Sequence, residues 1–370
     1  MSLFIDFHAV QTIPPANINR DEDGSPKSTV FGGTRRARVS SQAWKRAMRN
    51  DFHGHLDDSE LGVRTLRMVD LIADRIRERS SELSEVAQDR AIAVLTATGI
   101  KVEKVKPRKG AEDQSEYSKT GALLFLSNPQ IDALAELAIV SGDKIDKKQA
   151  KAILNRGNSI DLALFGRMIA DAPDLNVDAA AQVAHALGTH TVVPEFDYFT
   201  AVDDKQVEDN AGAGMIGTVE FNTATLYRYA TVNASLLLEN LGSVEAAVRG
   251  IEAFTRAFVG SMPTGKRNTF ANKTLPAFVL VTVRTDQPIN FAGAFEEAVA
   301  PDQGLATTSI SRLISEANST YAAYDAAPAV AFAVTSREVD GLAGFADRMS
   351  LNELASTLGT QLRDRLGGEQ

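Results

Sequence analysis

A change of sequence periodicity near residue 60, reversed near residue 190, constrains the fold of this chain more than any other feature. Between these points apolar residues recur about every 3.6 positions, which predicts a block of helices. On either side, short runs rich in β-branched and aromatic residues predict strands at 3–10, 277–285 and 328–336. A helical block inside a mixed remainder is typical of an α+β protein that carries a helical insertion.

The order of elements outside this block suggests a known topology. The expected elements are the strand at 3–10, a helix from Ser40 or Ser41, strands at VEFN (219–222) and TLYRYATVN (225–233), a helix across 235–259, the strand at 277–285 and a C-terminal helix at 351–366. The core of this order is β, α, β, β, α, β, as in ferredoxin-like and RRM-type folds. Residues 191–218 have β-type ends around a middle rich in Gly and Asp, which predicts an extended hairpin, and residues 14–34 predict a long surface loop.

The segment from Lys27 to Arg49 concentrates positive charge in an acidic chain. It contains seven basic residues and no acidic one, whereas the formal net charge of the whole chain is -9. A Gly32-Gly33 turn is followed by an extended run with Arg35, Arg36 and Arg38 and then by a helix start. Arginine forks bind phosphate in pairs of hydrogen bonds, and a helix start offers unpaired backbone N–H groups. The segment therefore predicts a track for a nucleic-acid backbone; the alternative is a solvated helix face with salt bridges to the acidic remainder.

Two further features extend this prediction. In the helix after Ser41, an apolar stripe leaves the basic side chains on the opposite, solvent-facing side. The stripe is formed by Trp44, Ala47, Met48 and Phe52, and the basic side chains are Lys45, Arg46 and Arg49. A second stretch without acids, residues 264–285, places Lys266 and Arg267 in a loop before a strand. That loop could approach the same groove or be an ordinary surface loop.

The sequence offers little for catalysis. Cys is absent, which excludes disulfides and thiolate metal sites, and the chain has no Walker A, GxSxG or HExxH motif. A metal at His53 and His55, or a nuclease that uses His185 or His190 as general base, is the weaker alternative. No apolar run approaches the roughly 20 residues that span a bilayer, and the N-terminus reads as a strand, so we expect a cytoplasmic protein without membrane contact.

The block NINRDEDGSPKSTVFGGTRRARVSSQAWKRAMR resembles the backbone subunit, of CasC type, of the type I-E CRISPR Cascade surveillance complex. Further matches follow in the same order along the chain. They are DLALFGRM (161–168), HALGTH (185–190), FDYFTAVDD (196–204), IGTVEFNTATLYRYATVN (216–233) and GKRNTF (265–270).

The resemblance implies a fold of three parts. An RRM-like palm would comprise residues 1–58, 182–192 and 221–370, with a helical fingers domain at 59–181 and a β-hairpin thumb at 193–220. It also implies a subunit that does not cut and needs neither cofactor nor metal. Six copies would assemble head to tail along the CRISPR RNA spacer, each thumb would displace a base, and the guide would be presented to target DNA. Further partners would be the large, small, repeat-end-binding and 5′-handle-binding subunits and a recruited helicase-nuclease.

The resemblance also assigns residues to the guide RNA. Palm contacts to the RNA backbone would come from Asn19, Arg20, Lys27, Ser40, Ser41, Gln42, Lys45, Arg46, Arg49, Lys266 and Arg267. Arg167 and Met168 would lie beside the guide, with Met168 against a base. Tyr198, Phe199, Val202, Met215 and Ile216 would belong to the thumb, with Met215 and Ile216 as candidates for the residue that displaces the base.

Two other functions remain open at this point. The chain could be a type III-like backbone subunit that cleaves target RNA, for which Asp203 and Asp204 lie in a plausible region. It could also be a general single-strand RNA-binding protein outside any CRISPR system.

Overall fold

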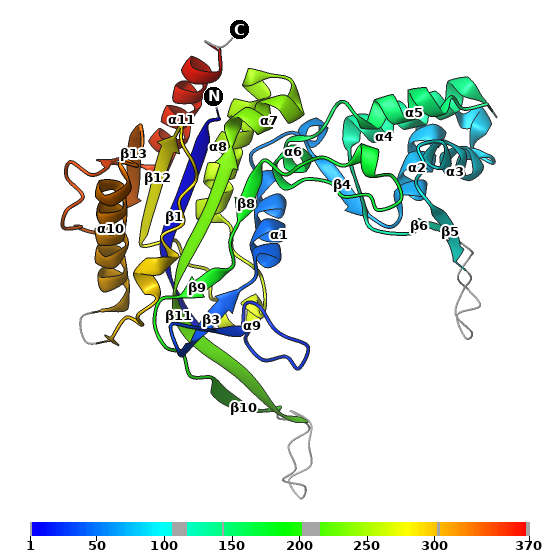
Figure 1. The fold of residues 1–370 in the computed structure, drawn as a ribbon. Helices are drawn as coiled ribbons and strands as arrows, with labels where there is room; N and C mark the ends of the chain where they lie inside the picture. The colour runs from blue at the N-terminus through cyan, green and yellow to red at the C-terminus, as the bar shows by residue number, and fades with distance from the viewer. Residues whose placement is uncertain (1, 106–116, 143, 202–214, 302–303, 368–370) are drawn as a thin grey trace, which may run out of the picture. The chain divides into compact units, whose positions relative to one another are not determined.

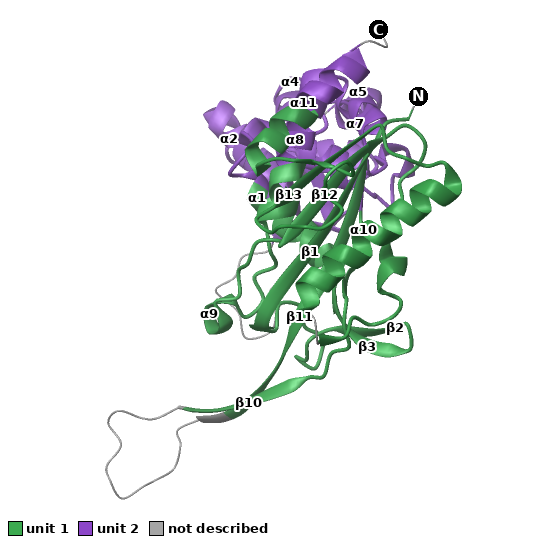
Figure 2. Ribbon diagram, turned by 90° about the vertical axis from the view of Figure 1, so that its left-hand side faces the viewer, with its two compact units in different colours: residues 1–51, 183–232, 254–358 green, residues 52–182, 233–253, 359–370 purple. Residues whose placement is uncertain are grey.

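The computed structural model describes residues 2–105, 117–142, 144–201, 215–301 and 304–367 (Figure 1). The chain divides into two compact units, each built from three separate stretches (Figure 2). Unit 1 comprises residues 1–51, 183–232 and 254–358, and unit 2 comprises residues 52–182, 233–253 and 359–370. The mixed α+β composition predicted from the sequence is confirmed.

A large twisted sheet forms the centre of unit 1. Within the described residues its strands follow the order β14-β13-β12-β1-β11-β9-β3-β2, and β8 and β10 also pair with β11. The strands are β1 (Phe4–Ala16), β2 (Ser28–Phe31), β3 (Thr34–Val39), β8 (Ala181–Val183), β9 (Ala186–Gly188), β10 (Glu195–Ala201), β11 (Met215–Asn233), β12 (Phe278–Arg284), β13 (Val330–Thr335) and β14 (Asp347–Arg348).

Strand β1 is buried on both sides because helices cover both faces of the sheet (Figure 2). On one face Phe7 packs against Phe254 and Phe258, with ring centroids 5.1 and 5.5 Å apart. On the other face His8 stacks on Phe291 at 4.8 Å. The helices that lie wholly or partly in unit 1 are α1 (Ser41–Phe52), α8 (Val244–Gly260), the short α9 (Arg267–Phe270), η4 (Ala292–Phe295), α10 (Leu305–Tyr324) and α11 (Leu351–Gly367).

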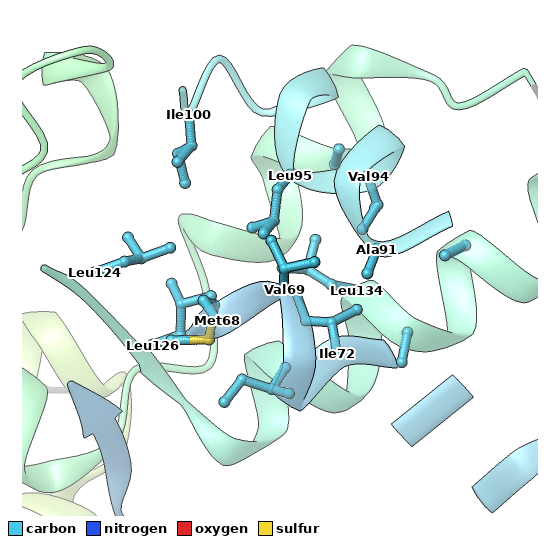
Figure 3. Packing of buried hydrophobic residues seen from close by; sticks show 14 of the residues in the cluster. Met68, Val69, Ile72, Ala91, Val94, Leu95, Ile100, Leu124, Leu126 and Leu134 are labelled. Carbon is cyan, nitrogen blue, oxygen red and sulfur yellow. The ribbon is translucent and has the colours of Figure 1, made fainter. Parts of the chain in front are cut away.

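Unit 2 has a helical core of its own (Figure 3). Val69, Ile72, Leu95 and Leu134 meet there without exposed surface. Its other elements are η1 (Asp58–Glu60), β4 (Gly62–Thr65), α2 (Met68–Arg79), η2 (Ser81–Leu83), α3 (Ala87–Ala97), β5 (Val102–Val105), β6 (Tyr117–Thr120), β7 (Leu124–Ser127), α4 (Asn128–Ser141), α5 (Lys147–Leu154), α6 (Ile160–Phe165), η3 (Pro173–Leu175) and α7 (Ala234–Leu241).

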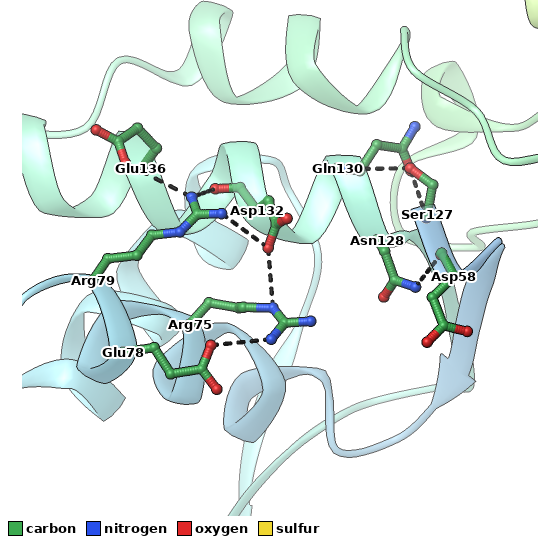
Figure 4. Close-up of polar contacts among 9 residues, drawn as sticks. All are labelled: Asp58, Arg75, Glu78, Arg79, Ser127, Asn128, Gln130, Asp132 and Glu136. Atoms are coloured by element: carbon green, nitrogen blue, oxygen red, sulfur yellow. Dashed lines mark hydrogen bonds and ion pairs between the residues drawn. The ribbon is translucent and has the colours of Figure 1, made fainter. Parts of the chain in front are cut away.

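Polar contacts join the helices of unit 2 (Figure 4). Asp132 on α4 forms ion pairs with Arg75 at 3.0 Å and with Arg79 at 3.2 Å, both on α2. At the start of α4, Ser127 and Gln130 form a reciprocal capping box. A helix that is both capped and tied to its neighbour keeps a defined position in the unit.

Three predicted elements were wrong in detail. The loop at 14–34 contains the end of β1 and the β2–β3 hairpin, because Gly32 and Gly33 make a tight turn instead of a flexible one. VEFN and TLYRYATVN form the single strand β11, so the second strand of the core order is β9. The helix at 235–259 is two helices, since Gly242 takes a left-handed conformation at the end of α7. Among the described helices, none is long and apolar enough to cross a membrane.

Candidate nucleic-acid interface

The three arginines of strand β3 differ in exposure, and Arg35 and Arg36 point to opposite faces of the strand. Arg35 is exposed and Arg38 is half-buried, whereas Arg36 between them is fully buried. The Arg36 guanidinium donates to the carbonyl oxygens of Gly188 (3.2 Å), Thr189 (3.0 Å) and Glu296 (3.0 Å). These bonds occupy the guanidinium inside the unit, so the expectation that Arg36 reaches a phosphate disagrees with its position.

The N-terminus of α1 is already supplied with hydrogen-bond acceptors. The Ala43 N–H donates to Oγ of Ser40 at 3.3 Å, and the Ser41 N–H donates to Nδ1 of His185 at 2.9 Å. The Ser40 N–H donates to Oδ1 of Asn19 at 2.8 Å. The predicted set of unpaired N–H groups at this helix start is therefore wrong for these three donors.

The outer face of α1 carries the predicted basic residues. Trp44 and Met48 point inward and are buried, as the apolar stripe predicts. Arg46 is exposed, whereas Lys45 and Arg49 are half-buried. Burial lowers the pKa of the Lys45 ammonium. Gln42 is exposed and Ser41 is half-buried beside this face.

The loop after β1 is held close to β3 and α1. Asn17 donates through Nδ2 to the carbonyl oxygens of Gly24 (2.9 Å) and Glu220 (2.8 Å), which closes the loop. The Lys27 N–H donates to the carbonyl of Asn19 at 2.9 Å. Backbone hydrogen bonds therefore bring Lys27 to the base of the arginine run on β3. Arg20 is exposed, and its backbone bridges to Pro26.

The loop that carries Lys266 and Arg267 is held in an unusual conformation. Lys266 (φ 51°) and Ala271 (φ 48°) bracket α9, and both are non-glycine residues in the left-handed region. Such strain persists only where the surroundings enforce it and is common at functional sites. A Cβ on Gly265 would lie 2.4 Å from the carbonyl oxygen of Ile18, so only glycine permits this packing. The loop is thereby joined to the segment that leads to Lys27.

A cavity of about 170 Å³ places this loop beside α1. Arg267, Asn272 and Lys273 line it from the loop, and Ala47 and Asn50 line it from α1. Arg267 and Lys273 of the second basic stretch therefore lie beside α1, the helix that carries part of the first stretch. This proximity could not be deduced from the sequence, because the two stretches lie more than 200 residues apart.

Arg167 and Met168, both in unit 2, have opposite exposures. Arg167 is buried and donates to the carbonyl oxygens of Leu154 (2.8 Å) and Leu175 (2.7 Å). Burial lowers the pKa of its guanidinium to about 10. Met168 is 83% exposed. The guanidinium of Arg167 is thus occupied inside unit 2, whereas the side chain of Met168 is exposed for a contact.

Strand β10 and the first half of β11 form a two-stranded ribbon that extends beyond the sheet of unit 1 (Figures 1 and 2). Tyr198 is 64% exposed. Phe199 covers Gly217, where a Cβ would come 2.5 Å from the ring. The backbones of Met215 and Ile216 pair with Ala201 and Thr200. Val202, Asp203 and Asp204 lie outside the described residues.

The ring nitrogens of His190, one of the histidines considered for catalysis, are hydrogen-bonded in a way that opposes a role as general base. The Nδ1 of His190 lies 2.9 Å from its acceptor, the carbonyl of Thr191, and Nε2 accepts from the Thr225 N–H at 3.1 Å. Both ring nitrogens are therefore used by the backbone. In the described part of the chain, no group of three or more His, Asp or Glu side chains is arranged to hold a metal ion.

Comparison with known proteins assigns the chain to a family. The family model of the CT1975-like protein matches residues 5–357. The chain belongs to the CT1975-like family. Among curated protein sequences no significant match was found.

Solved structures similar to this CT1975-like chain come from CRISPR complexes. A chain of a "CRISPR RNA-guided surveillance complex, pre-nicking" superposes with a TM-score of 0.83 at 36% identity, over 96% of this chain and 100% of that chain. A chain of a "CRISPR RNA-guided surveillance complex" gives a TM-score of 0.73 at 31% identity, over 96% and 99%. The predicted resemblance to a Cascade backbone subunit is thereby confirmed.

The CT1975-like chain also has two candidate site residues that the sequence reasoning missed. Phe196 is 69% exposed and lies two positions before Tyr198, on the same side of β10. The alternation Glu-Phe-Asp-Tyr was the available signal. His185 was considered only as a catalytic base, since nothing local in the sequence indicates that it contacts α1.

Proposed function

We propose that this chain is a non-catalytic backbone subunit of a type I-E Cascade complex, which binds CRISPR RNA along its spacer and presents it to target DNA. The observation that carries the proposal is the convergence of basic groups on unit 1. The Arg38 N–H donates to the carbonyl of Lys27, which holds Lys27 against β3, and the strained loop at 264–273 lies beside α1 with Arg267 and Lys273. Basic side chains suit a guide of any sequence, because phosphate contacts position a strand without reading it.

The topology of unit 1 supports an RRM-like palm. The strand order β12-β1-β11-β9 is that of a four-stranded ferredoxin-like sheet, in which the fourth strand neighbours the first and the third neighbours the second. Helix α1 follows β1 and helix α8 follows β11, as that fold requires. We assign the palm to residues 1–58, 182–192 and 221–370, the fingers to 59–181 and the thumb to 193–220.

The thumb assignment rests on the projecting ribbon. Its exposed Phe196 and Tyr198 offer aromatic surface for bases, and aromatic or apolar side chains can separate stacked bases. Exposed Met168 would support a base from the fingers. Copies would then associate head to tail along the guide, an arrangement that gives an open helical filament. Six copies, the other Cascade subunits and a recruited helicase-nuclease complete the proposed assembly, which would act in the cytoplasm.

The test is whether the purified protein retains RNA through this surface. Arg35 and Arg46 are exposed on β3 and α1. The double variant Arg35→Glu/Arg46→Glu should lose co-purifying RNA, whereas the matched control Arg337→Glu/Arg348→Glu makes the same charge change at exposed positions outside the surface and should retain it.

Sequencing the retained RNA separates the proposed function from general RNA binding. Repeat-flanked spacers are expected, and arbitrary RNA would favour a general single-strand binding protein. Equal RNA content in the two double variants would contradict the assignment of the surface. Cleavage of target RNA paired to the bound guide, abolished by Asp203→Ala, would show a nuclease instead.

A further inference from the structure

Residue His185 lies between the end of β3 and the start of α1, two elements of the proposed RNA surface. It directly precedes β9, whose Ala186 pairs with Val39 at the end of β3. This pairing brings the ring to the start of α1, where Nδ1 lies 2.9 Å from the backbone nitrogen of Ser41. The ring thus joins β9 to a helix 144 residues earlier in the chain.

This hydrogen bond determines which ring nitrogen of His185 carries the proton. A backbone N–H can only donate, so Nδ1 must be the acceptor and cannot carry a hydrogen. In a neutral imidazole the proton then lies on Nε2, because the partner of one nitrogen sets the state of the other. The side chain is exposed, and Nε2 has no hydrogen bond to another described residue.

The surroundings keep the ring neutral and favour an anionic ligand. Partial burial and the positive charges of Arg38 and Lys27 lower the pKa of His185. The same two cations raise the electrostatic potential around Nε2. An N–H donor in a positive environment is best complemented by an oxygen that carries negative charge, and phosphodiester oxygens have that chemistry.

We propose that His185 is a further RNA-binding residue, which donates its Nε2–H to a phosphate oxygen of the guide while its Nδ1 caps α1. This inference rests on the proposed function and adds an uncharged, oriented donor beside the cations of the surface. It also removes His185 as a general base, because Nδ1 is occupied and Nε2 is protonated. The Ser41 N–H acts as the positioning group that holds the donor outward.

Two substitutions separate the two roles of the ring. In His185→Asn, the amide oxygen can take the place of Nδ1 and keep the bond to Ser41, but no group reaches the place of Nε2. In His185→Gln, the amide nitrogen can reach the place of Nε2. Binding of the full chain to a labelled single-stranded RNA is measured by fluorescence anisotropy. His185→Asn should weaken binding about tenfold with an unchanged melting temperature, and His185→Gln should stay within about threefold of wild type.

The salt dependence of RNA binding separates a neutral donor at residue 185 from a cation. A neutral donor that binds a phosphate does not displace a counterion from the RNA. His185→Asn should therefore keep the wild-type slope of log K against log salt. Arg46→Ala, which removes a cation, should reduce the slope by about one. A reduced slope for His185→Asn would overturn the neutral donor.

A single-stranded DNA of the same sequence distinguishes phosphate from the ribose hydroxyl. A phosphate contact predicts the same fold loss for RNA and DNA, whereas a loss confined to RNA would overturn the phosphate assignment. If His185→Asn binds as tightly as wild type while Arg35→Glu/Arg46→Glu does not, this inference fails and the proposed function stands. If neither variant weakens binding, both fail.

Discussion

Neighbouring arginines on β3 have different roles because successive side chains of a strand point to opposite faces. Arg35 is exposed, whereas the buried Arg36 joins β3 to the backbone after β9 and to the carbonyl of Glu296. A buried guanidinium is tolerated only when its donors are paired. Sequence position alone would assign both residues to RNA.

The two arginines therefore predict opposite phenotypes. Arg36→Leu should lower the free energy of unfolding by about 3 kcal/mol, since it removes the guanidinium donor from three carbonyl oxygens. Arg35→Leu should change it by less than about 0.5 kcal/mol but weaken RNA binding. Urea denaturation and RNA titration of both variants check this. Equal destabilisation by the two substitutions would contradict it.

Burial of His8 predicts acid sensitivity. Burial and the charge of Arg284 lower its pKa from the ordinary 6.5 to about 3. Below about pH 6.5, His8 binds a proton in the unfolded chain but stays neutral in the folded chain. Acidification toward pH 3 therefore lowers the free energy of unfolding. At pH 4.5 the loss should be roughly 2–3 kcal/mol. His8→Phe should show a smaller decrease than wild type between pH 7.5 and 4.5 in urea denaturation.

Asp6 serves as a control of opposite sign. Burial raises its pKa from 3.8 to about 6, despite hydrogen bonds from Ile289 and Tyr229. Between about pH 6 and 3.8 the folded chain holds a proton that the unfolded chain releases, so acidification adds stability through this group. Asp6→Asn should therefore lose stability more steeply than wild type as pH falls. A shallower dependence would be inconsistent with a buried carboxyl.

At the scale of elements, the β2–β3 hairpin depends on two glycines for different reasons. Gly32 (φ +56°) lies against the backbone of Glu296, where a Cβ would come 1.6 Å from the carbonyl oxygen. Gly33 (φ +76°) has nothing within 4 Å of its Cβ position. Positive φ at both central residues is typical of a type I′ hairpin turn. The turn is therefore packed against the backbone of Glu296 at Gly32 and has open space at Gly33.

This difference predicts unequal costs of substitution. Gly33→Ala should cost about 1 kcal/mol, the strain of a left-handed alanine. Gly32→Ala should cost roughly 3 kcal/mol or more, because the hairpin must also move away from Glu296. Chemical denaturation of both variants measures the difference. Similar costs would show that the contact with Glu296 adds nothing.

At the scale of the whole molecule, the proposed function predicts assembly governed by RNA length. Copies that associate head to tail along a guide should form particles whose mass rises in steps as the RNA is lengthened, because each copy covers a fixed length. Sedimentation of the protein with single-stranded RNAs of increasing length measures this. One bound copy at every length would contradict head-to-tail assembly.

The helix stripe of α1 and the inserted helices were predictable because helical periodicity is local. The basic stretches were predictable from the charges of consecutive residues. VEFN failed as a separate strand because β11 continues without a break into the projecting ribbon. The internal hydrogen bonds of Arg36 and Arg167 could not be predicted because their partners come from other elements.

The sequence by itself determined the mixed fold class, the concentration of cations between Lys27 and Arg49 and the family resemblance. Only the tertiary structure decided which of those cations face solvent, that the loop with Lys266 lies beside α1, and that His185 caps Ser41. The physical reason is that periodicity and charge are properties of neighbouring residues. Hydrogen bonds and burial depend on residues that the sheet brings together from distant parts of the chain.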